Sequence, residues 1–345
     1  MSDNEQGMTF PTVLAYINQR VPIFQYAHRV RISPSQQDEL VNHFNQFSNK
    51  YYVQHFLKSL ITIYERTNIE VSESLYELYC SPEILNARAL KPTDFDNIVY
   101  HINQRDIIIG ESPSIISGQG TTGLRTWEAA SFLAKMVPCL EIGGTVCELG
   151  TGTGLVGISL TGDSRIRKVL FTDGDTNLFD NLVRNQELNQ VSREAHSISQ
   201  LLWGNDHHVP ETDYLVAADV TYDRSILEEL VCTISRFLAN GCKKCYIAAT
   251  VRNIDTVNEF EERMQNHGLK WDTIETFDPQ AESFPMLPKF ATPMLKHFWP
   301  FGVGAVVTYG LVYKGSVLSM NSDEFINDPR HPRFASGGKF IELEK

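Results

Sequence analysis

The run Val146-Cys147-Glu148-Leu149-Gly150-Thr151-Gly152-Thr153-Gly154-Leu155-Val156-Gly157 decides the fold of this chain. An apolar stretch leads into a glycine-rich turn, and further apolar residues follow, so the run predicts a strand, a turn and the start of a helix. Its first three glycines allow the backbone to turn sharply. They also let a ligand approach closely, because they carry no Cβ. The run therefore predicts a ligand-binding turn.

A carboxylate after the next strand indicates the kind of ligand. Val169-Leu170-Phe171-Thr172-Asp173 is typical of a second strand, and it ends in Asp173. A carboxylate at this place in a β-α-β unit can accept hydrogen bonds from both hydroxyls of a ribose. The two stretches together predict a unit that binds a nucleoside.

Two nucleoside cofactors fit this pattern. The spacing Gly152-x-Gly154-x-x-Gly157 with Asp173 behind it matches the dinucleotide fingerprint, so an NAD-dependent oxidoreductase is one alternative. Glu148 favours the other. A carboxylate two residues before the first glycine would repel a pyrophosphate, whereas it would attract a cofactor with a free amine and a sulfonium. We therefore expect S-adenosylmethionine.

Composition excludes several classes of protein. The chain has 345 residues, 42% of them hydrophobic, and a formal net charge of −12. An acidic chain without a basic run argues against a general nucleic-acid binder or a membrane-surface protein. No apolar run reaches the ~18 residues of a membrane span, and the start lacks the features of a signal peptide. The six cysteines show no zinc-site spacing, so we expect free thiols, no metal site and a cytoplasmic protein.

The chain divides into two expected domains. Residues 1–105 have apolar positions at helical spacing and no catalytic cluster, which predicts a helical accessory domain. Residues 106–345 alternate strand and helix patterns, and the last two strands are expected at 271–277 and 305–313. Residues 278–304 hold five prolines and are interpreted as a lid or a substrate-docking loop.

Further candidate site residues lie near expected strand and helix ends. Trp127 stands at a helix start that Thr126 is expected to cap, and Trp203 follows a strand, where an indole can cover an adenine. Asp219 and Tyr222 follow the strand 214–218, so they are expected over the ligand crevice of an open sheet. A structural role in the core remains an alternative for both tryptophans and for Tyr222.

These motifs occur in an order that resembles a known family. The glycine-rich run, Thr126–Ala130, Leu202-Trp203-Gly204 and Asp219-Val-Thr-Tyr222 together resemble the seven-strand protein-lysine methyltransferases, which are marked by Asp-x-x-Tyr/Phe after the fourth strand. With the helical extension, the chain is most similar to the elongation factor 2 lysine methyltransferases. The resemblance implies an α/β, Rossmann-like, S-adenosylmethionine-dependent methyltransferase domain behind an N-terminal helical domain that recognises the substrate.

The resemblance also implies roles for residues. The cofactor would be bound by Trp127, Gly150, Thr151, Gly152, Asp173, Trp203 and Ala218. Asp219 and Tyr222 would be catalytic residues at the methyl end. The implied partner is a protein substrate, elongation factor 2, for a monomeric enzyme that binds neither nucleic acid nor membrane. A methyltransferase acting on another protein, and a non-catalytic binding module, remain as alternatives. The absence of Asn/Asp-Pro-Pro-Tyr/Phe argues against methylation of adenine or glutamine.

Overall fold

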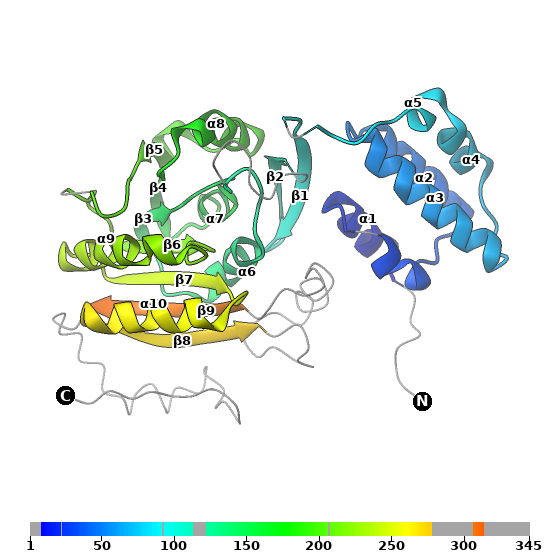
Figure 1. The fold of residues 1–345 in the computed structure, drawn as a ribbon. Helices are drawn as coiled ribbons and strands as arrows, with labels where there is room; N and C mark the ends of the chain where they lie inside the picture. The colour runs from blue at the N-terminus through cyan, green and yellow to red at the C-terminus, as the bar shows by residue number, and fades with distance from the viewer. Residues whose placement is uncertain are drawn as a thin grey trace. The chain divides into compact units, whose positions relative to one another are not determined.

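The computed structural model describes two stretches of the chain, and residues 278–304, the expected lid or docking loop, lie outside them. The first is 8–277 without 22, 92, 113–121 and 206–207, and the second is 306–313. The N-terminal part is helical, as predicted (Figure 1). Its helices are α1 (Phe10–Asn18), α2 (Pro34–Asn45), α3 (Lys50–Arg66), α4 (Glu73–Cys80) and α5 (Pro82–Leu85).

The helical part has its own hydrophobic core. One face of α3 repeats apolar residues three or four positions apart, and Phe56, Leu60 and Tyr64 on that face are buried. Ser33 starts α2 through a capping box, in which its hydroxyl accepts from the Gln36 amide at 3.3 Å and the Gln36 side chain accepts from the Ser33 amide at 2.9 Å.

A hairpin connects the helices to the rest of the chain. It consists of β1 (Asp96–Ile102) and β2 (Arg105–Glu111), so the expected boundary at 105/106 falls after the first residue of β2, and β1 lies in the part expected to be helical. Asp96 is fully buried, and its carboxylate accepts from the Arg20 guanidinium at 2.7 and 2.8 Å and from the Asn49 amide at 2.8 Å. This buried ion pair joins the end of α1 and the start of α3 to the hairpin.

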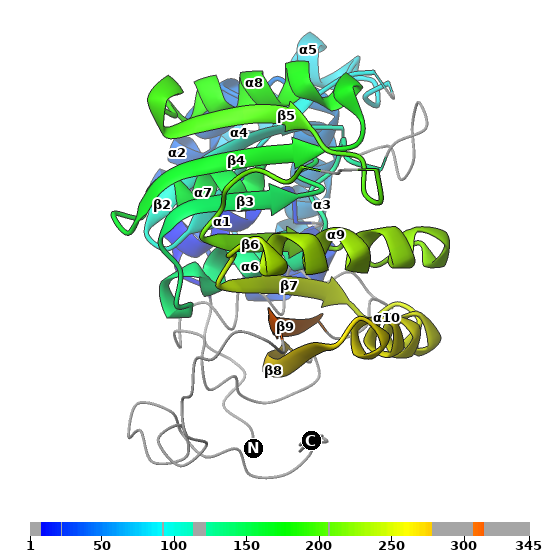
Figure 2. The same cartoon turned by 90° about the vertical axis from the view of Figure 1, so that its left-hand side faces the viewer.

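A seven-stranded sheet forms the second part. Figure 2 shows its strands from top to bottom in the order β5-β4-β3-β6-β7-β9-β8. They are β3 (Gly144–Leu149), β4 (Ile166–Asp173), β5 (His196–Gln200), β6 (Tyr214–Ala218), β7 (Lys244–Thr250), β8 (Leu269–Phe277) and β9 (Val306–Tyr313). β9 is antiparallel to β7 and β8, and the other pairs are parallel. The predicted seven-strand α/β fold and its last two strands are confirmed.

Helices cover both faces of this sheet. They are α6 (Glu128–Met136), α7 (Leu155–Leu160), α8 (Phe179–Leu188), α9 (Leu227–Ala239) and α10 (Ile254–Asn266). Successive side chains of a strand point to opposite faces. Val146 accordingly belongs to a core with Phe132 of α6, whereas Cys147 belongs to a second core with Ile234 of α9 and Phe260 of α10.

The strand order fixes where a ligand binds. From β3 the chain goes to β4 and β5 on one side, and it then returns to place β6 on the other side of β3. Ligands of open α/β sheets bind at such a reversal, beyond the carboxyl ends of the strands. The residues after β3 and β6 therefore define the expected crevice.

Candidate active site

The glycine-rich turn after β3 requires glycine. Gly150, Gly152 and Gly154 have φ values of 61°, 53° and 88°, a left-handed backbone that glycine adopts without strain. A Cβ on Gly150 would lie 2.8 Å from Val220 Cγ1 and 3.4 Å from the Trp203 ring. The turn at 150–154 therefore presents bare backbone at Gly150, Gly152 and Gly154, and we call this surface the glycine cradle.

Asp173 ends β4 beside this cradle. Its Oδ2 accepts from the Gly152 amide at 2.9 Å, and its Oδ1 accepts from the Asp175 amide at 3.0 Å. Burial raises the pKa of the Asp173 carboxyl, and these amide hydrogen bonds oppose the rise. The residue is half-buried, so its carboxylate keeps accessible lone pairs. The cradle and the carboxylate together fit the ribose and the adenine of an adenosyl group.

Two further candidates of the cofactor set border the same turn. The half-buried Trp203 follows β5, and its ring lies against Gly150. Ala218 is the last residue of β6 and pairs with Ala248 of β7, which places it at the reversal of strand order. Thr151 is buried instead, and its hydroxyl donates to Glu148 Oε2 at 3.1 Å. The Thr151 amide donates to the Thr172 carbonyl and the Thr151 carbonyl accepts from the Gly154 amide, both at 2.9 Å, so Thr151 fixes the shape of the turn.

The start of α6 lies against the turn, which places Trp127 near it. The Thr126 hydroxyl forms a hydrogen bond with the Thr153 hydroxyl at 2.8 Å, and a Cβ on Gly152 would lie 3.3 Å from the Gly123 carbonyl oxygen. The prediction that Thr126 caps α6 is wrong. The Thr126 hydroxyl is directed to Thr153, and the cap residue is Trp127. Trp127 makes no side-chain cap bond, because an indole has no acceptor for a backbone amide.

Asp219 lies after β6 with a left-handed backbone (φ 54°) and an 8% exposed surface. Its Oδ1 accepts from the Thr250 amide at 2.8 Å. Its Oδ2 accepts from the Thr250 hydroxyl at 2.9 Å and the Ala129 amide at 3.2 Å. The Arg252 guanidinium lies 3.3 Å from Oδ1. Asp219 thus joins the ends of β6 and β7 to the start of α6. Tyr222, three residues further along the chain, is at the surface, and 55% of the residue is exposed.

Two residues near the site, Arg252 and Glu111, were not predicted from the sequence. The Arg252 guanidinium pairs with Glu128 at 2.8 Å and lies 4.9 Å from the centre of the Trp127 ring. Glu111 is buried at the end of β2, where its carboxylate accepts from the Tyr100 hydroxyl at 2.7 Å and the Thr126 amide at 2.5 Å. Both residues hold the start of α6, and no local pattern around them signals it.

Glu148 lies under the turn rather than at its surface. It is 3% exposed, and its Oε2 accepts from the Thr151 hydroxyl and the Gly157 amide, both at 3.1 Å. Burial raises its pKa from about 4.5 to about 8, although these hydrogen bonds oppose the rise. The Glu148 carboxyl therefore fastens the two ends of the turn to each other.

This raised pKa predicts a pH-dependent stability. The folded state binds the Glu148 proton more tightly than the unfolded chain, so stability falls as the pH rises from about 4.5 through about 8. Glu148→Gln removes this titration. Between pH 6 and pH 8 the free energy of unfolding should fall by roughly 2 kcal/mol more in the wild type than in the variant. Urea unfolding at both pH values measures the difference. An equal change in the free energy of unfolding in the wild type and in Glu148→Gln would refute the assignment.

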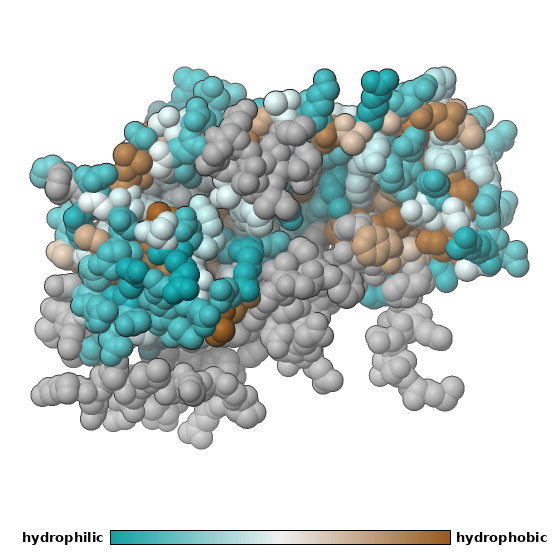
Figure 3. Space-filling model, viewed as in Figure 1, coloured by the Kyte–Doolittle hydropathy of each residue, from teal (hydrophilic) through white to brown (hydrophobic). Residues whose placement is uncertain are grey.

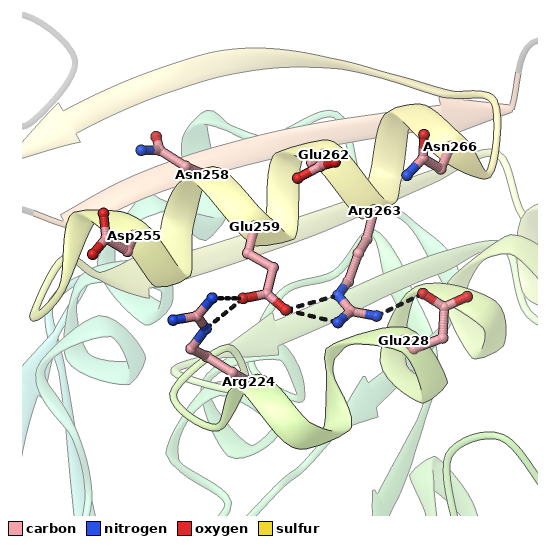
Figure 4. A pocket seen from close by; sticks show the side chains of 8 residues that line it. All are labelled: Arg224, Glu228, Asp255, Asn258, Glu259, Glu262, Arg263 and Asn266. Carbon is pink, nitrogen blue, oxygen red and sulfur yellow. Dashed lines mark hydrogen bonds and ion pairs between the residues drawn. The ribbon is translucent and has the colours of Figure 1, made fainter.

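A polar groove between α9 and α10 is separate from these residues (Figure 4). It is lined by Arg224, Glu228, Asp255, Asn258, Glu259, Glu262, Arg263 and Asn266. Arg263 pairs with Glu259 at 2.7 Å and with Glu228 at 2.8 Å, and Arg224 pairs with Glu259. These ion pairs occupy both arginines of the groove, and its lining has no aromatic residue to stack on an adenine. It is not the cofactor site.

The fold and the site together define the class of protein. A seven-stranded sheet with one antiparallel strand, a glycine cradle and a carboxylate beside it at the reversal of strand order are those of a seven-strand, S-adenosylmethionine-dependent methyltransferase. No helix among the described residues is long and apolar enough to cross a membrane, and those residues hold no cluster of potential metal ligands.

Comparison with known proteins identifies the family. Residues 117–272 match the family profile described as lysine methyltransferase. The chain is 33% identical over 237 residues to the protein-lysine N-methyltransferase EFM3 of Saccharomyces cerevisiae, covering 62% of this chain and 69% of that protein. It is 31% identical over 242 residues to human protein-lysine N-methyltransferase EEF2KMT, covering 64% and 72%. The chain belongs to the lysine methyltransferase family, so it is a protein-lysine N-methyltransferase and its cofactor is S-adenosylmethionine.

A second family matches the end of the chain. Residues 289–339 match the profile described as ATP synthase j chain. A stretch of 60 residues, 17% of this chain, is 60% identical to mitochondrial ATP synthase subunit J of Saccharomyces cerevisiae and covers 100% of it. The methyltransferase match ends at residue 272, and β9 lies inside the j-chain match.

Proposed function

We propose that this enzyme methylates a lysine of translation elongation factor 2 in the cytoplasm, as a monomer. The similarity to the elongation factor 2 lysine methyltransferases carries this proposal, together with relatives at 31–33% identity that are named protein-lysine N-methyltransferases. The acidic net charge of −12 adds to it, because such a surface suits a basic segment around a lysine.

The proposed roles of the residues follow from their places around the strand reversal. Asp173 binds the ribose hydroxyls, Gly150, Thr151 and Gly152 line the backbone cradle, and Trp203 and Ala218 border the adenine. Trp127 covers the cofactor from the start of α6.

At the methyl end, Asp219 and Tyr222 handle the lysine. When bound, S-adenosylmethionine supplies an electrophilic methyl group. The chain must therefore hold a neutral lysine amine in line with that methyl. Asp219 orients the amine for attack, while the ring face of Tyr222 favours the cationic product.

Labelling tests the proposed substrate. The purified enzyme, radiolabelled cofactor and a lysate from cells that lack the enzyme should give one labelled band with the mass of elongation factor 2. Purified elongation factor 2 should become labelled on lysine. A labelled protein of another mass, with the purified factor unlabelled, would refute this substrate and leave the lysine methyltransferase activity in place.

Tyr222 offers a test of the methyl end. Because 55% of its surface is exposed, its truncation should cost little stability. Tyr222→Phe keeps the ring face and should lower turnover less than about threefold, whereas Tyr222→Ala should lower it at least about tenfold. Single-turnover rates measure both variants. Equal rates for Ala and Phe would show that the ring does not act on the amine.

We propose that the N-terminal helices recognise the protein substrate. In Figure 3 several hydrophobic patches interrupt the hydrophilic surface over these helices, and Phe24 and Leu85 are 71% and 53% exposed. Replacing both by alanine should raise the KM for elongation factor 2 about fivefold without changing cofactor affinity. Ile254→Ala is the matched control, because Ile254 is a 59% exposed hydrophobic residue at the start of α10. An unchanged KM in the double variant would contradict the proposal.

We also propose a second function, for the last 60 residues. A whole-length relative at 60% identity supports the view that they act as a subunit of ATP synthase, in addition to supplying β9 to the methyltransferase sheet. Met286 begins a segment of that length. A tag at Lys345 should migrate with assembled ATP synthase in a native gel. A Lys345 tag absent from ATP synthase would refute this assignment.

A further inference from the structure

Arg252 lies between Asp219 and Trp127, two residues of the proposed site. It follows β7, its side chain is 36% exposed, and its guanidinium reaches three partners. It lies 3.3 Å from Asp219 Oδ1 and 2.8 Å from Glu128 Oε2, and its centre is 4.9 Å from that of the Trp127 ring. A planar guanidinium with five N–H donors can serve two carboxylates and stack on a ring at once, which an ammonium cannot do.

The charges around Asp219 are balanced. Arg252 reaches Asp219 from the end of β7 and also pairs with Glu128 of α6, beside which Arg125 lies. Tyr222 and Asp223 are the titratable groups that follow Asp219 on its own segment. Arg125 lies 3.8 Å from Glu128, so two guanidiniums accompany these two carboxylates. Glu111 of β2, beside the start of α6, also interacts with Arg125, but burial raises the pKa of its carboxyl and so favours its neutral form. A lysine that arrives as a cation would add an uncompensated positive charge here.

This balance matters for the protonation state of the substrate. A lysine ammonium cannot attack a methyl group, because its nitrogen has no lone pair, so it must first release a proton to solvent. A bare carboxylate would stabilise the ammonium and retain that proton. A carboxylate paired with a guanidinium can orient the nitrogen with a weaker hold on its charge. We propose that Arg252 is a positioning residue that keeps Asp219 charge-compensated, so that lysine is bound as the reactive neutral amine.

The inference rests on the proposed role of Asp219, and a pH profile tests it. The variants are Arg252→Gln, which removes the charge, and Arg252→Lys, which keeps it. Arg224→Gln is the matched control, because Arg224 is another partly exposed arginine that pairs with a glutamate, Glu259, outside the site (Figure 4). Single-turnover rates from pH 6 to 9.5 are measured with saturating cofactor. Calorimetry with S-adenosylhomocysteine and melting of the free enzyme report binding and folding separately.

The acid limb of the rate profile should move up by about 0.5–1 pH unit in Arg252→Gln. It should stay in place in Arg252→Lys and Arg224→Gln. Binding of S-adenosylhomocysteine should weaken only about two- to fivefold in Arg252→Gln, through the lost contact with Trp127. An unmoved limb in Arg252→Gln would overturn the proposal. If that variant does not fold, Arg252→Met, which also removes the charge, takes its place: a raised limb supports the proposal and an unmoved limb overturns it.

Asp219→Asn separates this inference from the proposed function. Slow turnover in Asp219→Asn with an unmoved limb in Arg252→Gln refutes only the role of Arg252. Normal turnover in Asp219→Asn refutes the proposed role of Asp219 itself.

Discussion

Asp219→Asn should lower the single-turnover rate roughly 100-fold or more, the usual contribution of a positioned acid–base group. Asparagine keeps the shape and one acceptor oxygen but loses the charge that would orient the lysine amine. Its amide nitrogen would also face the Thr250 amide, which now donates to Oδ1 at 2.8 Å, or the Ala129 amide, which donates to Oδ2 at 3.2 Å. A donor facing a donor costs about 1–3 kcal/mol of stability.

The measurement must therefore separate chemistry from folding. Binding of S-adenosylhomocysteine to Asp219→Asn should change much less than the rate, since the carboxylate is proposed to touch the substrate. Asp223→Asn is the control, because Asp223 is the next carboxylate along the chain and caps a short helical turn by accepting from the Ser225 amide at 2.9 Å. It should turn over normally. A folded Asp219→Asn enzyme with wild-type rates would end the proposal that this residue handles lysine.

Asp173→Ala should weaken cofactor binding more than tenfold. Two hydrogen bonds from ribose hydroxyls to a charged acceptor are worth about 2–4 kcal/mol together. The variant also releases the Gly152 amide, which donates to Asp173 Oδ2 at 2.9 Å, so the empty enzyme should melt about 2–4 °C lower. Calorimetry with S-adenosylhomocysteine measures the affinity.

Asp175→Ala is the matched control for Asp173. Asp175 lies two residues further on, and its side chain accepts from the Asn177 amide at 3.0 Å. Its replacement should leave the affinity unchanged. Because the pKa of Asp173 is raised by burial, binding in the wild type should also weaken as the pH falls through that pKa, and this dependence should vanish in Asp173→Ala. Unaltered affinity in Asp173→Ala would contradict the ribose assignment.

The parts of the site that the sequence predicts are those built from short stretches. Strand, turn and helix follow one another within 146–157, so the positive φ angles at Gly150, Gly152 and Gly154 follow from local glycine spacing. The position of Asp173 follows as well, because a parallel neighbour strand must end at the same edge of the sheet.

The parts that the sequence does not predict depend on contacts across the fold. Arg252 meets Glu128 from 124 positions away, and their spacing carries no pattern. Thr126 has the right residue type for a helix cap, but Thr153 takes its hydroxyl and Glu111 takes its amide. Glu148 favoured the correct cofactor by its charge, yet the folded chain buries it beneath the turn.

The place of β9 has a consequence for synthesis of the chain on the ribosome. β7 and β8 emerge before β9, which begins at Val306, well after β8 ends at Phe277. Until Val306–Tyr313 has been made, the partner that pairs with both strands is missing, and their edges are open to pairing with other chains. A nascent chain that stops near Phe277 is therefore the species most exposed to aggregation, and chaperone binding should peak at that length.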